Sequence, residues 1–275
     1  MDLVVPFHAV GNTMHRRVCP LYSFDQGGHV RLVGSAVPFK EGHIAFLITA
    51  THVCLTPNRQ SIPLFTLAGS GPRVLQGMRL AWEYQRGKTP DADLTLIALS
   101  CDEFHDLQSE YAFSESSDIA MAKEKQPFMH YMIVGYPATR NRVSNSDTSL
   151  RPIATHLVTG DVRPVYDLRI ADKFDSSHFA IYLSHREIKT AQGSSFRVPK
   201  PNGMSGGGVW RLELDPRTRL ISSFYLVGIG IEYHKCRSIF LATRIQLAAP
   251  LANDLLDLVA GKCPAGVVPL PAASQ

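Results

Sequence analysis

The sequence has little of what marks the more specialised classes of protein. Its 275 residues contain only five cysteines, and no two of them form a Cys-x-x-Cys pair. They are spread over the whole chain, as Cys19, Cys54, Cys101, Cys236 and Cys263. An odd number of scattered cysteines is typical of neither a disulfide framework nor a zinc site. We therefore expect reduced thiols, no metal site and no cofactor.

Long apolar runs and a strong excess of one charge are also missing. No segment reaches the roughly 18 to 20 consecutive apolar residues that cross a membrane. The first residues, Met-Asp-Leu-Val-Val-Pro-Phe, carry an acidic residue and lack the basic region of a secretory signal. Because 28 Lys and Arg residues are scattered among 24 Asp and Glu residues, the net charge of +4 does not indicate nucleic-acid binding. These absences favour a cytoplasmic protein that binds neither a membrane nor a nucleic acid.

Short apolar segments separated by turn signals dominate the chain, of which 45% is hydrophobic. Residues 30–39 alternate in polarity, residues 44–50 form a continuous apolar run, and Lys40-Glu41-Gly42 between them predicts a hairpin. Further strands are expected at 61–67, 74–82, 94–99, 128–135, 152–159, 162–170, 178–183, 208–214, 221–233 and 238–243. About a dozen short strands with turns between them predict a β-sandwich or a pair of barrels.

Two segments break the strand pattern. Leucine recurs at helical spacing between Leu247 and Leu258, and Gly261 then suits a helix stop. This spacing predicts one amphipathic helix near the end of an otherwise all-β chain. Residues 101–126 are polar and acidic in patches, and we expect a loop with a short helical turn that connects two halves.

The stretch from Pro201 to Trp210 reads Pro-Asn-Gly-Met-Ser-Gly-Gly-Gly-Val-Trp and places one serine, Ser205, among four glycines. Glycine permits sharp turns and a close approach to the backbone. A serine presented in this way, beside free N–H groups, suits a nucleophile with its own oxyanion hole. An ordinary turn is the alternative interpretation. A phosphate-binding loop does not fit, because no Lys-Ser or Lys-Thr follows the glycines.

Two other polar residues stand at the ends of apolar segments. His52 follows the run at 44–50, where a histidine is more often a surface or structural residue. Asp93 directly precedes the run at 94–99 and could simply end a turn. If its carboxylate is buried it needs a partner, and an imidazole would supply one. Asp91 is a second carboxylate in the same turn.

Three segments occur in a telling order: Thr49-Ala50-Thr51-His52, then Asp93 opening an apolar strand, then Gly203-Met204-Ser205-Gly206-Gly207. In this order and at these spacings the chain resembles the chymotrypsin-like (trypsin-like) serine peptidase family over about residues 30–260. Gly34-Ser35, the strand at 227–231 and the C-terminal helix also match features of that family. The resemblance implies an all-β fold of two packed antiparallel six-stranded β-barrels with a C-terminal α-helix.

The resemblance also implies a role for each residue. Ser205 would attack the scissile carbonyl, His52 would accept and return the proton, and Asp93 would orient the imidazole. The N–H groups of Gly203 and Ser205 would bind the oxyanion, at about 3 kcal/mol per donor. The implied division of the chain is an N-terminal extension (1–29), a first barrel with the histidine and aspartate (30–120), a second barrel with the serine and the helix (121–262), and a tail (263–275).

Departures from the family pattern point to an intracellular bacterial-type or viral-type member. Met204 stands where secreted members have an aspartate that pairs with a newly released N-terminus, and Val53 replaces a half-cystine beside the histidine. Ile231 replaces a serine that supports the catalytic aspartate in many members.

Substrate preference is expected to depend on three positions. Pro199 lies where an aspartate marks a preference for Arg or Lys, which suggests a shallow or apolar pocket. Phe240 is a candidate for the wall of that pocket. Glu232, near the same strand, could instead receive a basic side chain.

The leading interpretation is a serine endopeptidase that acts on a protein or peptide substrate. The alternative is a catalytically latent binding or scaffold module of the same fold, switched on by a partner. An esterase of the α/β-hydrolase type does not fit, because there the histidine comes last and a helix follows the serine. No pattern in the sequence specifies an oligomeric state.

Overall fold

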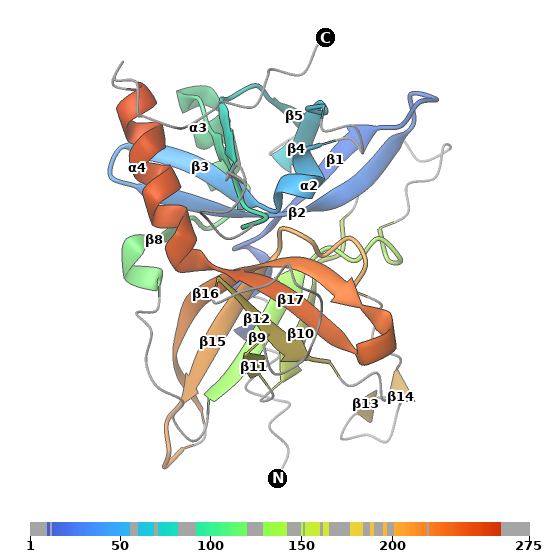
Figure 1. Ribbon diagram of the computed structural model, residues 1–275, viewed down its shortest axis with the longest axis vertical. Coiled ribbons are helices and arrows are strands. Elements are labelled where there is room, and N and C mark those ends of the chain that lie inside the picture. The colour runs from blue at the N-terminus through green and yellow to red at the C-terminus, as the bar shows by residue number, and fades with distance from the viewer. Residues whose placement is uncertain are drawn as a thin grey trace.

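Two curled antiparallel β-sheets, each forming a half-barrel, lie one above the other along the longest axis of the molecule (Figure 1). The computed structural model describes residues 10–11, 13–55, 60–68, 71–81, 92–119, 129–141, 150, 152–159, 162–164, 177–183, 188–189, 195–196, 201–218 and 220–259. Asp91, Pro199, Cys263 and the expected tail at 263–275 lie outside these residues.

The first sheet is built around the expected hairpin at residues 30–50. All six residues of its second strand are buried, as a continuous apolar run predicts, and Gly42 takes a positive φ of 58° in the turn. Along the sheet the strands follow the order β5-β4-β1-β2-β3-β7-β6, and β8 pairs with β2 in parallel. In chain order they are β1 (Cys19–Phe24), β2 (Val30–Glu41), β3 (Ile44–Thr49), β4 (Leu64–Ala68), β5 (Gly71–Leu75), β6 (Arg79–Ala81), β7 (Thr95–Ala98) and β8 (Ser114–Glu115).

The first sheet begins before residue 30, so the expected N-terminal extension is not separate from it. Strand β1 pairs with β2, although a proline inside a strand argues against pairing. Pro20 is tolerated because it lies opposite Ser35, whose own N–H and C=O are bonded to Ser205 and Thr49. Its missing N–H therefore leaves no ladder bond unmade.

The second sheet has the order β10-β9-β15-β16-β17-β12-β11. Its strands are β9 (Met129–Gly135), β10 (Thr155–Thr159), β11 (Val162–Pro164), β12 (His178–Tyr182), β15 (Gly208–Leu214), β16 (Ile221–His234) and β17 (Ile239–Arg244). A separate short hairpin consists of β13 (Ile188–Lys189) and β14 (Ser195–Phe196). The described sheets thus contain eight and seven strands, where six each were expected. Short strands such as β8 have too few residues to show an alternating pattern.

The helices are partly as expected. They are α2 (Thr51–Cys54), α3 (Cys101–Glu110) and α4 (Ala248–Val259), with 3-10 turns η1 (Ser116–Asp118), η3 (Lys235–Arg237) and η4 (Ile245–Leu247). Helix α3 is a full ten-residue helix where only a helical turn was expected. It begins at a capping box in which Ser100 and Glu103 bond to each other's backbone N–H, and this Ser-x-x-Glu signal is visible in the sequence.

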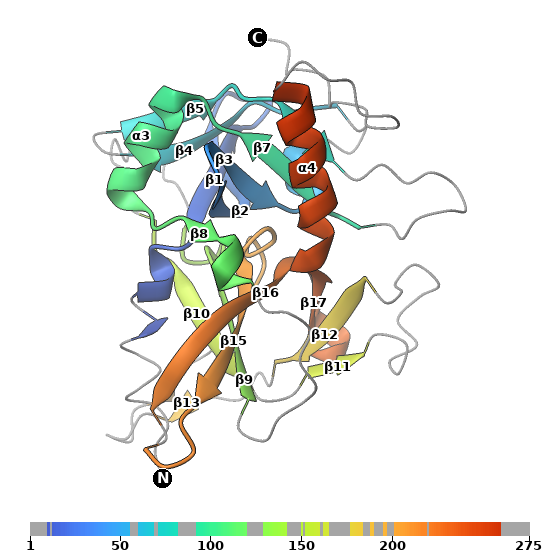
Figure 2. The same ribbon diagram turned by 90° about the vertical axis from the view of Figure 1, so that its left-hand side faces the viewer.

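Helix α4 follows the last strand of the second sheet but packs on the first one (Figures 1 and 2). Leu251 and Leu255 join a core that includes Leu80 and Leu96 of the first sheet and Trp210 of the second. This apolar core thus contains residues of both sheets and packs them against each other. The predicted all-β fold of two packed antiparallel units with a C-terminal helix is confirmed.

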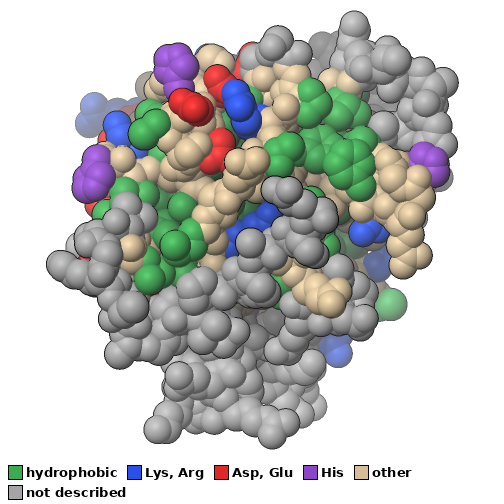
Figure 3. Space-filling view, turned by 90° about the horizontal axis from the view of Figure 1, so that it is seen from above, with side chains coloured by type: hydrophobic (Ala, Val, Ile, Leu, Met, Phe, Trp, Pro, Cys, Tyr) green, Lys and Arg blue, Asp and Glu red, His purple; other side chains and the backbone are tan. Residues whose placement is uncertain are grey.

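The face of the first sheet that points away from the second carries charges of both signs (Figure 3). Arg73 of β5 forms an ion pair with Asp106 of α3. None of the helices that the structure describes is long and apolar enough to cross a membrane. Helix α4, for example, has 12 residues.

Candidate active site

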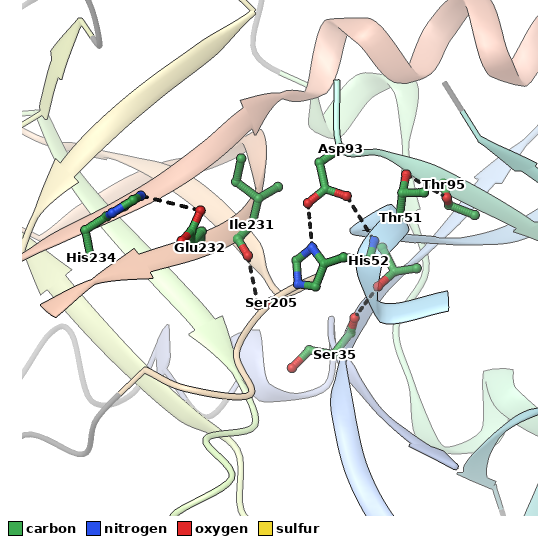
Figure 4. A network of polar contacts seen from close by, with 10 residues as sticks. Ser35, Thr51, His52, Asp93, Thr95, Ser205, Ile231, Glu232 and His234 are labelled. Atoms are coloured by element: carbon green, nitrogen blue, oxygen red, sulfur yellow. Dashed lines mark hydrogen bonds and ion pairs between the residues drawn. The ribbon is translucent and has the colours of Figure 1, made fainter. Parts of the chain in front are cut away.

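His52 is placed by the short helix α2, which starts directly after β3. The hydroxyl of Thr95 on β7 donates a hydrogen bond of 2.9 Å to the hydroxyl of Thr51, tying the start of α2 to the neighbouring strand. Because of this bond, His52, which follows Thr51, lies close to Asp93, which is two positions before Thr95. His52 and Asp93, 41 positions apart, therefore meet at the end of the first sheet (Figure 4).

The contact between His52 and Asp93 has two parts. The main-chain N–H of His52 donates to Oδ1 of Asp93 at 3.0 Å, and Nδ1 of the ring lies 2.5 Å from Oδ2. A carboxylate can only accept, so Nδ1 carries the proton and Nε2 of the neutral ring is left as the acceptor. The sequence-based pairing of these two residues is therefore present, in the tautomer that a general base requires.

The protonation of His52 is shifted toward the charged form. Partial burial of the ring lowers its pKa, but the hydrogen bond and the charge of Asp93, together with the charge of Glu232, outweigh burial and raise the pKa of His52 above its ordinary value. About half of the His52 side-chain surface (51%) stays exposed. An imidazole in this environment can accept a proton from a neighbouring group and hold it.

The loop before β15 has a left-handed backbone at two positions, a conformation that glycine adopts easily and other residues rarely do. Gly203 and Gly206 have φ values of 88° and 82°. A Cβ at Gly206 would lie 1.9 Å from the carbonyl oxygen of Ser35, so no side chain fits there. Ser205 is held between these two turns, half-buried, at the junction of the two sheets.

Two N–H groups beside the Ser205 side chain are left without an acceptor in the described part of the chain. In the peptide before Gly203, the Asn202 carbonyl accepts from the N–H of Ala138 at 2.7 Å. In the peptide before Ser205, the Met204 carbonyl accepts from the N–H of Gly207 at 2.9 Å. Because C=O and N–H point in opposite directions across a trans peptide, the N–H groups of Gly203 and Ser205 point away from these partners. They are available to an oxygen of a bound molecule.

The hydroxyl of Ser205 forms its hydrogen bond with a main-chain carbonyl and not with the imidazole of His52. Its Oγ donates to the main-chain carbonyl of Ile231 on β16 at 2.9 Å (Figure 4). A hydroxyl has one proton to donate, so in this conformation the proton is not shared with Nε2 of His52. In Figure 4 the His52 ring lies between Asp93 and the segment that carries Ser205.

The other predicted residues are placed as follows. Met204 is fully buried in the core of the second sheet, together with Phe240, of which 1% is exposed. The Phe240 ring lies directly against Gly230, where an added Cβ would come within 2.3 Å of it. Glu232 is exposed next to the site, and its carboxylate lies 3.5 Å from Nε2 of His234.

Two groups that form hydrogen bonds at this site were missed by sequence reasoning. The Ile231 carbonyl is a main-chain group, so the residue type at this position does not indicate it. Ser35 was noted only as part of a matching Gly-Ser pair, yet it bonds to Ser205 and Gly203 from the first sheet. Within the described residues, no group of three or more His, Cys, Asp or Glu side chains is arranged to hold a metal ion.

No protein-family model and no curated protein sequence matches this chain. Solved structures are similar to it. A catalytically inactive tobacco etch virus protease complexed with substrate is 11% identical, with a TM-score of 0.47, over 96% of this chain and 91% of that one. The protein GrC is 10% identical, with a TM-score of 0.48, over 88% and 95%. Tobacco vein mottling virus protease is 14% identical, with a TM-score of 0.42, over 85% and 79%.

Proposed function

We propose that the protein is a serine endopeptidase that hydrolyses peptide bonds through His52, Asp93 and Ser205. The observation that carries the proposal is the contact of His52 with Asp93, which leaves Nε2 as a proton acceptor at the junction where Ser205 lies. The free N–H groups of Gly203 and Ser205 support it, because acyl transfer needs donors for the oxyanion.

The chemistry would proceed by acyl transfer. As Oγ of Ser205 bonds to the scissile carbonyl carbon, its proton passes to Nε2 of His52, and the charged ring is stabilised by Asp93. The N–H groups of Gly203 and Ser205 hold the negative oxygen of the tetrahedral intermediate. His52 then returns the proton to the leaving amine as the C–N bond breaks. A water molecule, deprotonated by the same ring, attacks the acyl carbon, and the ring returns that proton to Oγ of Ser205 as the carboxylic acid leaves.

This reaction requires the Ser205 hydroxyl to leave the Ile231 carbonyl. A rotation about the Cα–Cβ bond would carry Oγ from that carbonyl toward Nε2 of His52. A substrate N–H that bonds to the Ile231 carbonyl would compete with the hydroxyl for the same acceptor. Binding of an extended peptide would therefore release the nucleophile at the moment when it is needed.

A serine-directed probe tests the proposal. Diisopropyl fluorophosphate is expected to form a P–O bond to Oγ of Ser205 with loss of fluoride, which mass spectrometry of the intact protein and its peptides detects. Ser205→Ala should remain unlabelled, whereas Ser222→Ala, at an exposed serine of β16, should label like the wild type. Equal labelling of Ser205→Ala would contradict the proposal.

A latent binding or scaffold module is the second candidate, and the hydrogen bond from Ser205 to Ile231 favours it. A peptidyl diphenyl phosphonate distinguishes the two because it carries backbone N–H groups that the small probe lacks. Faster labelling by the peptidyl reagent supports the peptidase. If neither reagent labels Ser205 and a partner protein restores labelling, the latent module is supported.

We expect Glu232 to influence both catalysis and substrate choice. Its negative charge raises the pKa of His52, so Glu232→Gln should lower that pKa. Since the reaction needs a neutral ring, the acid limb of the labelling rate should then move to lower pH. Glu110→Gln, at an exposed residue of α3, makes the same change in net charge away from the site and should leave the limb in place. A limb that stays or moves upward in Glu232→Gln would contradict this prediction.

Specificity and location complete the proposal. The exposed carboxylate of Glu232 would receive a basic substrate side chain. The alternative is an apolar pocket above Gly230, with Phe240, which is buried behind Gly230, as its floor. The protein would act in the cytoplasm, where thiols stay reduced. The cysteines at positions 19, 54, 101 and 236 are free, and burial raises the pKa of the first two to about 12, which makes them inert.

A further inference from the structure

Ser35 is a fully buried residue of β2 that uses every one of its polar groups. Its main-chain N–H donates to the Ser205 carbonyl at 2.8 Å, and its carbonyl accepts from the hydroxyl of Thr49 at 2.7 Å. Its own hydroxyl accepts from the N–H of Tyr136 at 2.9 Å and donates to the carbonyl of Gly203 at 3.3 Å. Three of these four bonds, those to Ser205, Tyr136 and Gly203, join the first sheet to segments next to the second.

The register of β2 explains why Ser35 can reach across. Strand β2 pairs with β3 only from Val37 onward, because β3 ends at Thr49 and the chain turns into α2. The N–H and C=O of a strand residue leave the strand on the same edge. At Ser35 this edge is no longer occupied by β3, and the segment around Ser205 takes the place of the missing strand.

Each successive peptide of the loop that carries Ser205 is fixed by a hydrogen bond of its own. The four successive peptides each have a carbonyl that accepts one hydrogen bond, and two of the four donors belong to Ser35. The bonds are Ala138 N–H to Asn202 O, Ser35 Oγ to Gly203 O, Gly207 N–H to Met204 O, and Ser35 N–H to Ser205 O. The N–H groups of Gly203 and Ser205 belong to the first and third of these peptides, so their directions depend on the peptides that Ser35 holds.

We infer that Ser35 is a positioning residue, which holds the loop so that the two free N–H groups and the Ser205 side chain keep their orientation without an ionic contact inside the loop. The inference rests on the proposed function. Ser35 itself is buried and acts through Gly203 and Ser205. Met204, buried among apolar side chains, has no charge with which to anchor the loop. The anchor therefore comes from the opposite sheet.

Ser35→Ala removes the hydroxyl and leaves the main-chain bond to Ser205 in place. The carbonyl of Gly203 and the N–H of Tyr136 both lose their partner, so the middle of the loop is free to tilt. The second-order rate constant for labelling of Ser205 by diisopropyl fluorophosphate should fall about 10- to 100-fold, since a displacement of about 1 Å has an effect of this size. The pH midpoint of labelling should stay unchanged, because the contact of His52 with Asp93 is untouched.

Ser23→Ala is the matched control. Ser23 lies on the adjacent strand β1, is likewise buried, and donates its hydroxyl to a main-chain carbonyl, that of Pro63, at 2.7 Å. It should lower the melting temperature in a similar way and leave the labelling rate at the wild-type value. Equal labelling rates in Ser35→Ala and Ser23→Ala would overturn the inference.

Amide hydrogen exchange gives a second readout that does not depend on activity. In Ser35→Ala, exchange should become about tenfold faster at the amide of Tyr136, which loses its own hydrogen bond, and should also rise at the loop amides of Met204 and Gly207. All three amides should exchange at the wild-type rate in Ser23→Ala. Unchanged exchange in Ser35→Ala would overturn the inference. A wild type that exchanges as expected but never labels would refute the peptidase proposal while the positioning of the loop by Ser35 stands.

Discussion

Asp93→Asn is expected to lower kcat about 10⁴-fold, the size of the effect when a triad aspartate is replaced by asparagine. The side-chain amide would donate toward Nδ1 of His52, so Nδ1 would have to be unprotonated and Nε2 would carry the proton. A ring in that tautomer cannot accept the proton of Ser205. Hydrolysis of fluorescein-labelled casein, with circular dichroism to verify the fold, measures the effect.

Asp25→Asn is the control for this variant. Asp25 is another aspartate that lies near a histidine, with 3.4 Å between its Oδ1 and Nδ1 of His29, but both residues are exposed and lie in the turn between β1 and β2. We expect Asp25→Asn to keep wild-type activity. Comparable activity in Asp93→Asn and Asp25→Asn would show that the contact of Asp93 with His52 has no catalytic role.

Gly206→Ala is expected to cost about 3 to 5 kcal/mol of unfolding free energy, from a left-handed backbone and an overpacked site together. The added Cβ would lie 1.9 Å from the Ser35 carbonyl oxygen and 2.2 Å from Oγ1 of Thr49, and both atoms belong to well-packed strands. The loop would have to move away from the first sheet, so labelling of Ser205 should be lost as well. Urea unfolding of the purified variant measures the cost in stability.

Gly42→Ala separates strain from crowding. Gly42 also has a positive φ, of 58°, but no atom lies within 4 Å of the position that a Cβ would take. Only the cost of the left-handed conformation applies there, about 1 to 2 kcal/mol. If Gly206→Ala were no more destabilising than Gly42→Ala, the close contact between the Ser205 loop and β2 would be refuted.

The two sheets depend on each other at the site. His52 and Asp93 belong to the first sheet, and Ser205 belongs to the second, while Ser35 and Gly206 bring the two into direct contact. A change that separates the sheets would thus separate the proposed base from the proposed nucleophile. The hydrogen bond from Ser205 to Ile231 joins the proposed nucleophile to β16 of the second sheet.

The amino-acid sequence by itself determined most of the local structure. The apolar run at 44–50 became β3, the strand expected at 208–214 became β15, and the leucine spacing after Leu247 became α4. Gly203 and Gly206 adopt the positive φ angles that a glycine-rich turn predicts. These features depend on the steric preferences of a residue and on the polarity of its near neighbours, and both are present in a short stretch of chain.

Only the tertiary structure decided which distant groups meet. It paired β1 with β2 in spite of Pro20, and it laid α4 against the first sheet. It also decided that the Ser205 hydroxyl bonds to the Ile231 carbonyl and that Ser35 bonds to the loop that carries Ser205. Main-chain carbonyls are the same at every residue, and their partners lie up to 170 positions away, as for the carbonyl of Ser205 and the N–H of Ser35. Their role therefore depends on the packing of the two sheets and leaves no pattern in the sequence.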